Sequence, residues 1–149
     1  MIITDESLLR MECSDVLPNE VGELVDTLER ELKRSAELGR PGIGLAAPQI
    51  GIAKNIAIVR IPSTGSAYNV DLVNCKIDEA FDKKIFKDEG CLSFPNRYED
   101  TMRYQEIKVT NNYVKPYSFI ATGLFAVVIQ HELDHLSGIL LSDNAISKI

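Results

Sequence analysis

Between residues 18 and 39, hydrophobic side chains recur every three or four positions, and charged side chains fill most positions between them. This period is typical of an amphipathic helix that packs one face on a hydrophobic core. Pro18 suits the first turn of a helix, and Gly39 suits its end. We therefore expect one helix here, covering a sheet, with a hydrophobic face made of Val21, Leu24, Val25, Leu28, Leu32 and Ala36.

A second helical pattern runs from residue 124 to about residue 137, and hydrophobic residues surround it on most sides. A helix of that kind is expected to be buried. The same stretch holds a group of polar residues, which are Gln130, His131, Glu132, Asp134 and His135. Burying polar groups is costly unless they bond to a partner. We therefore expect these five side chains to have bonding partners.

Runs rich in β-branched residues between the two helices predict strands. We expect strands at 55–61, 68–74, 77–81, 85–88, 106–111 and 118–122, with a hairpin turn at 62–66 joining the first two. Segment 41–49 is rich in glycine, alanine and proline, and it fits neither a helix nor a regular strand. Its glycines allow the backbone to approach a ligand closely. Residues 1–18 are expected to form an irregular lead-in.

The composition fits one domain, residues 1–149, with 45% hydrophobic and 26% charged residues. The net charge is −6 and no run of Lys or Arg occurs, so direct binding of nucleic acid is not expected. No hydrophobic stretch approaches the ~20 residues of a membrane span, and the first residues lack a signal-peptide pattern. We therefore expect a cytoplasmic protein without a membrane partner. Three cysteines, an odd and small number, argue against a disulfide framework.

The two histidines of the chain, His131 and His135, lie four residues apart in an HExxH pattern. Four residues of a helix correspond to about 40° of rotation and about 6 Å of rise, so both imidazoles can reach one metal ion. Glu132 lies beside that ion, where it can take a proton from a bound water molecule. The alternative is a pair of core histidines bonded to local carboxylates. It is disfavoured because the motif holds every histidine of the chain and lies in an otherwise hydrophobic helix.

A catalytic site of this type usually has three protein ligands and one position open for water. Cys91 is a candidate third ligand, because Gly90 allows close backbone approach and a nearby divalent ion lowers the pKa of a thiol. Cys13 and Cys75 are rivals, although Cys13 lies near an end of the chain and Cys75 lies in a hydrophobic stretch typical of a core cysteine. The residues by themselves leave this choice open.

Three segments together resemble motifs of the peptide deformylase family. They are Gly42-Ile43-Gly44-Leu45-Ala46-Ala47-Pro48-Gln49, then Glu89-Gly90-Cys91-Leu92-Ser93, then residues 130–138, which read Gln-His-Glu-Leu-Asp-His-Leu-Ser-Gly. They occur in the family's order, with spacing close to the family's. Segment 5–10 also fits the family's early Leu-Arg segment, so the resemblance covers most of the chain.

The resemblance implies an α+β fold in which antiparallel β-sheets pack around a central helix that carries HExxH, with an N-terminal amphipathic helix. It also implies hydrolysis of the N-formyl group from the formyl-methionine that starts newly made polypeptides, with release of formate. Cys91, His131 and His135 would bind one divalent metal ion, with a water molecule in the fourth position as the nucleophile. Glu132 would be the general base and acid. The ion implied is usually Fe²⁺, with Zn²⁺ or Ni²⁺ as alternatives.

The resemblance further implies which groups contact the substrate. The Gln49 side-chain amide and the Leu92 backbone N–H would donate hydrogen bonds to the developing oxyanion. The methionine side chain would enter a hydrophobic pocket along the helix, and the backbone of segment 43–44 would bond the peptide as a neighbouring strand does. The residues implied in substrate binding are Ile43, Gly44, Gly90, Leu124, Val127 and Val128. For Val127 and Val128, a plain role in the core stays open.

Some features depart from the family's pattern. The chain ends 11 residues after Gly138, where many bacterial members continue into a helix that helps them dock on the ribosome. We therefore expect a transient proximity to ribosomes without that helix, and the short form resembles members carried by phages. Cys75 follows Asn74 where the family often has proline, and Phe94 is bulkier than the usual aliphatic residue and is expected to reshape the rim of the cleft.

Two rival functions would use the same motif. A metallopeptidase also has HExxH but takes histidine or glutamate as its third ligand, and the chain has no third histidine. A non-catalytic binding protein with this fold would have lost a ligand or the base, and all four residues are present. Glu89, Asp134 and Arg103 either orient the metal ligands or form ordinary salt bridges, and the sequence leaves that choice open.

Overall fold

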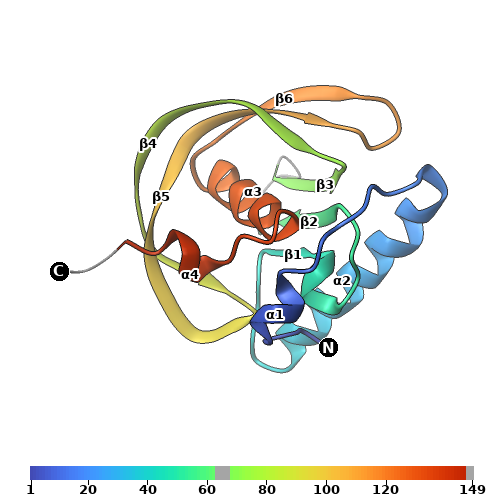
Figure 1. Ribbon diagram of the computed structural model, residues 1–149, viewed down its shortest axis with the longest axis horizontal. Coiled ribbons are helices and arrows are strands. Elements are labelled where there is room, and N and C mark those ends of the chain that lie inside the picture. Colours follow the sequence, from blue (N-terminus) through green and yellow to red (C-terminus); the bar gives the residue numbers. More distant parts are fainter. Residues whose placement is uncertain (63–67, 147–149) are drawn as a thin grey trace.

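The computed structural model describes residues 1–62 and 68–146, and its strands form two antiparallel sheets around helix α3 (Gly123–Leu136) (Figure 1). The first sheet has the order β1-β2-β3, and the second has the order β4-β5-β6. Their strands are β1 (Gly44–Ala46), β2 (Ile56–Arg60), β3 (Asn69–Val73), β4 (Lys76–Cys91), β5 (Phe94–Asn111) and β6 (Tyr117–Thr122). In Figure 1, β4 and β5 run as long arcs that curve around α3.

Helix α3 joins the two sheets through a shared hydrophobic core. One cluster of buried residues contains Ala126, Ile129 and Leu133 from α3, Val59 and Leu72 from the first sheet, and Ile107 and Val109 from the second. Burial of each large aliphatic side chain stabilises the fold by about 1.5–3 kcal/mol before the entropy cost is counted. The helix is therefore held from both sides, and its orientation relative to both sheets is determined by packing.

Helix α2 (Val21–Glu37) packs on the first sheet with one face, as its amphipathic pattern predicts. Val25, Leu28 and Leu32 lie in a second core cluster with Leu45 of β1 and Ile58 of β2. The remaining helical elements are short. They are α1 (Glu6–Leu9), the 3₁₀ turns η1 (Pro18–Glu20) and η2 (Ala47–Ile50), and α4 (Leu141–Asn144).

The predicted fold class is confirmed, since antiparallel sheets surround a central helix and an amphipathic helix precedes them. The helix expected at 18–39 is η1 followed by α2, and the helix expected at 124–137 is α3. The burial expected for α3 holds from Ala126 to Leu136 except at Asp134, which is half-buried, whereas Leu124 in the first turn is 47% exposed.

The strand predictions between the helices need correction. Segments 77–81 and 85–88 belong to one continuous strand, β4, which also includes the motif 89–91, and segment 106–111 is the last third of β5. Most β4 side chains are exposed, so hydrophobic runs do not mark the length of this strand. Segment 41–49 contains β1 and most of η2, and the lead-in contains α1. Strands β2 and β3 pair antiparallel as expected, but residues 63–66 of the predicted turn lie outside the described residues.

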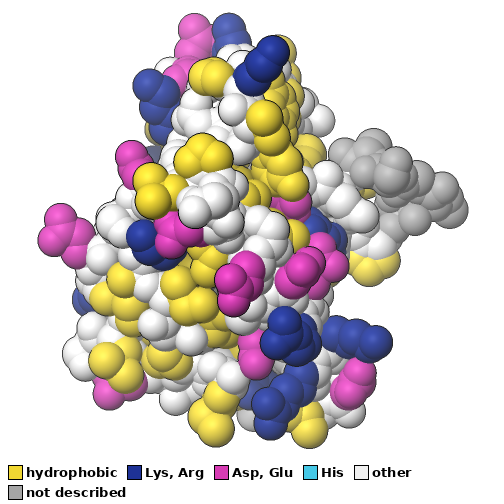
Figure 2. Space-filling model, turned by 90° about the vertical axis from the view of Figure 1, so that its right-hand side faces the viewer, with side chains coloured by type: hydrophobic (Ala, Val, Ile, Leu, Met, Phe, Trp, Pro, Cys, Tyr) yellow, Lys and Arg dark blue, Asp and Glu magenta, His cyan; other side chains and the backbone are white. Residues whose placement is uncertain are grey.

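Within the described residues, no helix is both long enough and hydrophobic enough to cross a lipid bilayer. Figure 2 shows one face of the molecule, on which Lys and Arg side chains lie beside Asp and Glu side chains. This mixture differs from the stripe of positive charge that nucleic-acid-binding proteins commonly present.

Candidate metal centre

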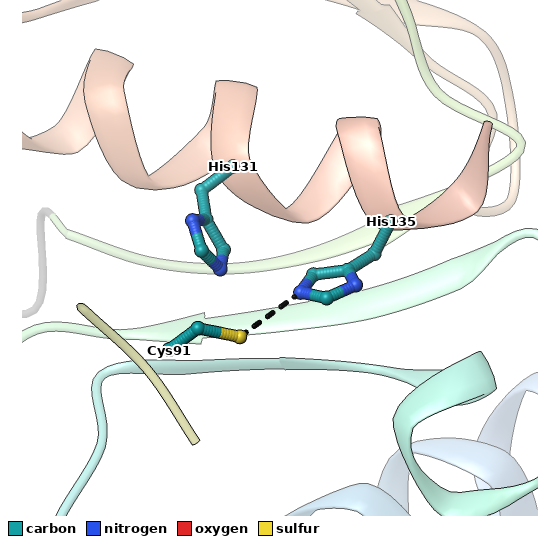
Figure 3. A group of neighbouring side chains, drawn as sticks. All are labelled: Cys91, His131 and His135. Carbon is teal, nitrogen blue, oxygen red and sulfur yellow. Dashed lines mark hydrogen bonds between the residues drawn. The ribbon is translucent and has the colours of Figure 1, made fainter. Parts of the chain in front are cut away.

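Cys91, at the end of β4, and two histidines on successive turns of α3 come together in the structure (Figure 3). Their ligand atoms all lie within 4.8 Å of one another, and Cys91 Sγ lies 3.3 Å from Nε2 of His135. Figure 3 shows both imidazole rings directed from α3 toward the sulfur atom. Cys13 and Cys75, the rival ligands, lie outside this group.

The orientation of His131 follows from a bond made on the other side of its ring, whereas Nδ1 of His135 has no hydrogen-bond partner among the described residues. Nδ1–H of His131 donates to Glu89 Oε2 at 2.8 Å, which leaves Nε2 of His131 for the cluster. Burial opposes a charge on His131, but hydrogen bonds with Cys91 and Glu89 outweigh it and raise the pKa of His131. Burial, followed by the nearby His131, lowers the pKa of His135, which favours a neutral ring able to act as a ligand.

Glu89 is the centre of a buried ionic network next to the cluster. Its carboxylate is 5% exposed and accepts from Arg103 Nε at 2.8 Å, from Arg103 Nη2 at 2.7 Å and from Thr101 Oγ1 at 2.9 Å. Arg103 also donates to Asp134 at 2.6 Å. Burial alone would raise the pKa of Glu89, but the hydrogen bonds from Arg103 and His131 outweigh it, so that pKa lies at about 2. Glu89 therefore stays ionised and fixes the His131 ring.

Glu132 faces the same cleft and is buried, with 3% of its surface exposed. Burial is the main cause that raises the pKa of Glu132 to about 7, which suits a group that takes and returns a proton near neutral pH. Its Oε1 has no hydrogen-bond partner among the described residues. Gly44 of β1 lies against this carboxylate, and a Cβ atom added to Gly44 would overlap with Glu132 Oε2. The glycine thus makes room for the acid.

Gln49 reaches the cluster from η2 and is 1% exposed. Its Oε1 accepts from the Ala46 backbone N–H at 3.0 Å, so the amide orientation is fixed. Nε2 then lies 3.5 Å from Cys91 Sγ and donates to Ser93 Oγ at 3.1 Å. Leu92 lies between those two residues, in the turn that joins β4 and β5. The side-chain amide of Gln49 and the backbone of Leu92 therefore border the same space.

A cavity of about 500 Å³ adjoins the cluster. Its lining includes each residue expected to bind substrate, namely Ile43, Gly44, Gly90, Leu124, Val127 and Val128. Phe94 also lines it, as expected from its bulk. The sequence pattern did not single out other lining residues, among them Arg40, Phe86, Arg97 and Tyr98. Successive side chains of a strand point to opposite faces of the sheet, and this alternation along β4 and β5 could have suggested that Phe86 and Tyr98 face the cavity.

The three converging side chains fit a divalent metal ion. A thiolate and two imidazole nitrogens are common ligands of catalytic zinc and of other borderline metals, and two of the three residues, Cys91 and His131, also line the cavity. Ligand bonds of about 2.0–2.3 Å would place such ligand atoms between about 3 and 4 Å apart. The 3.3 Å between Cys91 Sγ and His135 Nε2 lies in that range, and the three ligand atoms lie within 4.8 Å of one another. Within the part of the chain that the structure describes, Cys91, His131 and His135 form the group with this geometry.

Comparisons with known proteins agree on one family. Residues 1–148 match the family model described as polypeptide deformylase. Peptide deformylase 1 of Bacillus subtilis (strain 168) is 40% identical over 128 residues, which are 80% of this chain and 78% of that protein. Peptide deformylase of Stutzerimonas stutzeri (strain A1501) is 37% identical over 131 residues, 87% of this chain and 74% of that protein.

Solved structures give the same result. Peptide deformylase from Thermotoga maritima has a TM-score of 0.83 and 30% identity, with 99% of this chain and 97% of that chain covered. A probable peptide deformylase from Synechococcus phage S-SSM7 has a TM-score of 0.82 and 37% identity, with 97% and 98% covered. The expected likeness to phage-encoded members is therefore confirmed. Because the family model matches nearly the whole chain, a curated member is 40% identical to it, and solved members share its fold, the chain belongs to the peptide deformylase family, the metal-dependent hydrolases that act on N-formyl amides.

Proposed function

We propose that Cys91, His131 and His135 hold the catalytic divalent ion of this deformylase and that Glu132 is its general base. The substrate is the N-terminal formyl-methionine of a newly made polypeptide, and the products are formate and a free amino terminus. The observation that supports this assignment is the meeting of three ligand atoms, within 4.8 Å of one another, at a cavity that the Glu132 carboxylate also lines.

The chemistry can be divided between the ion and the chain. A divalent ion at this site would lower the pKa of a water molecule and polarise the formyl carbonyl. Glu132 takes the proton of the attacking water through its unpartnered, buried Oε1 and later returns it to the leaving amine. Its raised pKa, about 7, suits both transfers. Burial also keeps bulk water from competing for the proton.

The developing oxyanion needs hydrogen-bond donors that are already oriented. We assign this role to the Gln49 side-chain amide and to the Leu92 backbone N–H. The assignment of Gln49 is supported by the orientation of its amide. The Ala46 backbone N–H donates to Oε1, and Nε2 is therefore directed toward Cys91 and Ser93. Because that nitrogen carries two hydrogens and Ser93 accepts one, the other is directed at Cys91 Sγ, 3.5 Å away, and would donate to an oxyanion formed there.

The peptide backbone of the substrate is expected to pair with the open edge of β1. The Ile43 carbonyl accepts from Arg60 N–H at 2.7 Å and therefore points toward β2. Since backbone groups alternate along a strand, the N–H and C=O of Gly44 face the open edge and can bond the peptide. Gly90 borders the same cavity from β4. Leu124, Val127 and Val128 supply a hydrophobic pocket for the methionine side chain.

A formate-release assay tests the assignment. The purified protein should release formate from a formyl-Met-Ala-Ser peptide and bind about one metal ion per chain. Glu132→Ala should keep the metal and lose about 10²-fold or more in kcat, because a general base supplies that much. Cys91→Ala should lose the metal itself. A Glu132→Ala variant with full activity would show that another group is the base.

We assign Fe²⁺ as the physiological ion, following the resemblance to the family, because the thiolate and imidazole ligands by themselves suit Zn²⁺ and Ni²⁺ as well. Metal analysis of protein purified under anaerobic conditions tests this, and zinc as the tightly bound ion of the most active preparation would contradict it. Because the proposed substrate is made on ribosomes, we propose that the enzyme acts in the cytoplasm, transiently near ribosomes. Co-sedimentation with ribosomes that carry formylated nascent chains tests that proximity.

A further inference from the structure

The turn that carries Leu92 is an unusual one for its length. Leu92 and Ser93 form a two-residue connection between β4 and β5, since Cys91 pairs with Phe94 across it. Two-residue hairpin loops prefer turn types that need a positive φ, because those match the twist of the strands. Among the described residues, the non-glycine residues with positive φ are Asn74, Asp82, Asp88 and Asn96, so neither turn residue adopts one. The turn therefore depends on contacts from other segments to keep its geometry.

Segment 40–49 supplies such contacts. Gln49 Nε2 bonds Ser93 Oγ at 3.1 Å, which holds one residue of the turn through its side chain. The Leu92 side chain packs so close to Gly42 that a Cβ atom on Gly42 would lie 2.6 Å from Leu92 Cδ1. Arg40 Nη2 donates to the Leu92 backbone carbonyl at 2.5 Å. Of these three, the Arg40 bond acts on the backbone of the residue whose N–H is the assigned oxyanion donor.

Arg40 itself is held from the other side. Its backbone N–H donates to the Ser35 carbonyl at 2.9 Å, and its carbonyl accepts from Ser35 Oγ at 2.6 Å. Ser35 lies in α2 and is 7% exposed, so the backbone of Arg40 is anchored to a packed helix. The guanidinium therefore reaches Leu92 from a fixed point, and shortening the side chain leaves that anchor intact.

We propose that Arg40 is a positioning residue for the deformylation reaction. By holding the Leu92 carbonyl it fixes the dihedral angles of Leu92, so that the backbone N–H points at the formyl oxygen when negative charge develops there. This inference rests on the proposed role of the Leu92 N–H. It assigns to Arg40 an effect on the transition state and none on the ground-state binding of the peptide.

The size of the effect can be bounded. Deleting an oxyanion donor costs about 10²–10³ in kcat, so a donor that is present but loosely oriented should cost less. For Arg40→Met we expect kcat to fall about tenfold, with KM changed by less than about twofold. Arg40→Lys should recover most of the loss, because an ammonium group can donate to the same carbonyl. Millimolar guanidinium chloride should raise the kcat of Arg40→Ala.

Arg34→Met is the matched control, since Arg34 is an exposed arginine of α2 that does not line the cavity. Metal content and melting temperature are measured for each variant, and kcat is expressed per bound metal ion. A kcat for Arg40→Met equal to that of Arg34→Met would overturn the inference. So would a loss confined to KM, because Arg40 lines the cavity and would then bind the peptide directly. Failure of the unmodified enzyme to release formate would instead contradict the proposed function.

Discussion

Replacing Glu89 with glutamine tests whether the ionic network beside the metal centre stabilises the fold. The pKa of Glu89 is about 2, against an ordinary value of 4.5. At about 1.4 kcal/mol per pH unit, this difference corresponds to about 3 kcal/mol of stability near neutral pH. Arg103 keeps its bond to Asp134 in the variant, so the loss should lie at the low end of the about 3–5 kcal/mol that breaking a buried ion pair costs.

The stability that the Glu89 carboxylate contributes should depend on pH. The pKa of Glu89 is depressed in the folded state, so its contribution is complete above pH 4.5 and is lost as the pH falls from 4.5 toward 2. Urea unfolding of the chelator-treated protein at pH 7 should therefore show a gap of about 3 kcal/mol between Glu89→Gln and the unmodified protein. This difference in the free energy of unfolding should become steadily smaller when the urea unfolding is repeated at pH values below 4.5.

Glu99→Gln is the matched control, because Glu99 is the cross-strand partner of Glu89 and its own bond, to Arg97 at 2.9 Å, is at the surface. That exposed pair should contribute about 1 kcal/mol or less. Glu89→Gln should also weaken metal binding by about 10- to 100-fold, since the His131 ring loses the group that orients it. If the two variants lose the same free energy of unfolding, Glu89 does not stabilise the fold through the buried network. A loss for Glu89→Gln that does not change with pH would refute the role of the ionised carboxylate.

Further predictions follow from single contacts. Gly44→Ala should keep the metal but lower kcat at least tenfold, as its Cβ displaces the Glu132 carboxylate, and a formate assay with metal analysis would detect this. Gly22→Ala, on an open face of α2, should raise the melting temperature through a gain of about 0.5–1 kcal/mol. Asn111→Ala should cost about 2–3 kcal/mol in urea unfolding, because the buried amide makes three hydrogen bonds. Removing the metal with a chelator should abolish formate release, and added Fe²⁺ or Ni²⁺ should restore it.

The helices were predictable because their signal is periodic and local. The hydrophobic positions of α2 recur at helical spacing, and the HExxH pattern places two imidazoles on one side of α3 whatever surrounds the helix. Gln49 and Leu92 were proposed as oxyanion donors through the motifs of the family, since nothing in the local pattern near either residue indicates catalysis. Arg40 carried no signal, and for Arg103 the sequence left open whether it orients the metal ligands or forms an ordinary salt bridge. The Arg40 side chain bonds Leu92 and the Arg103 side chain bonds Glu89 and Asp134, and such long-range partners depend on how distant segments pack.

The Cys91 side chain faces α3 because of a β-bulge in β4, and the alternation of hydrophobic and polar residues does not reveal that bulge. Phe86 lines the cavity and pairs with Thr101, which is fully buried. Strict alternation from Phe86 would turn residues 88 and 90 toward α3, and Glu89 and Cys91 away from it. The register shifts between Phe86 and Glu89, where Asp88 has a φ of 56°, and this bulge reverses the two faces. Cys91, the proposed thiolate ligand, and Glu89, the carboxylate that orients His131, thus face α3 on the same side because of one extra residue in β4.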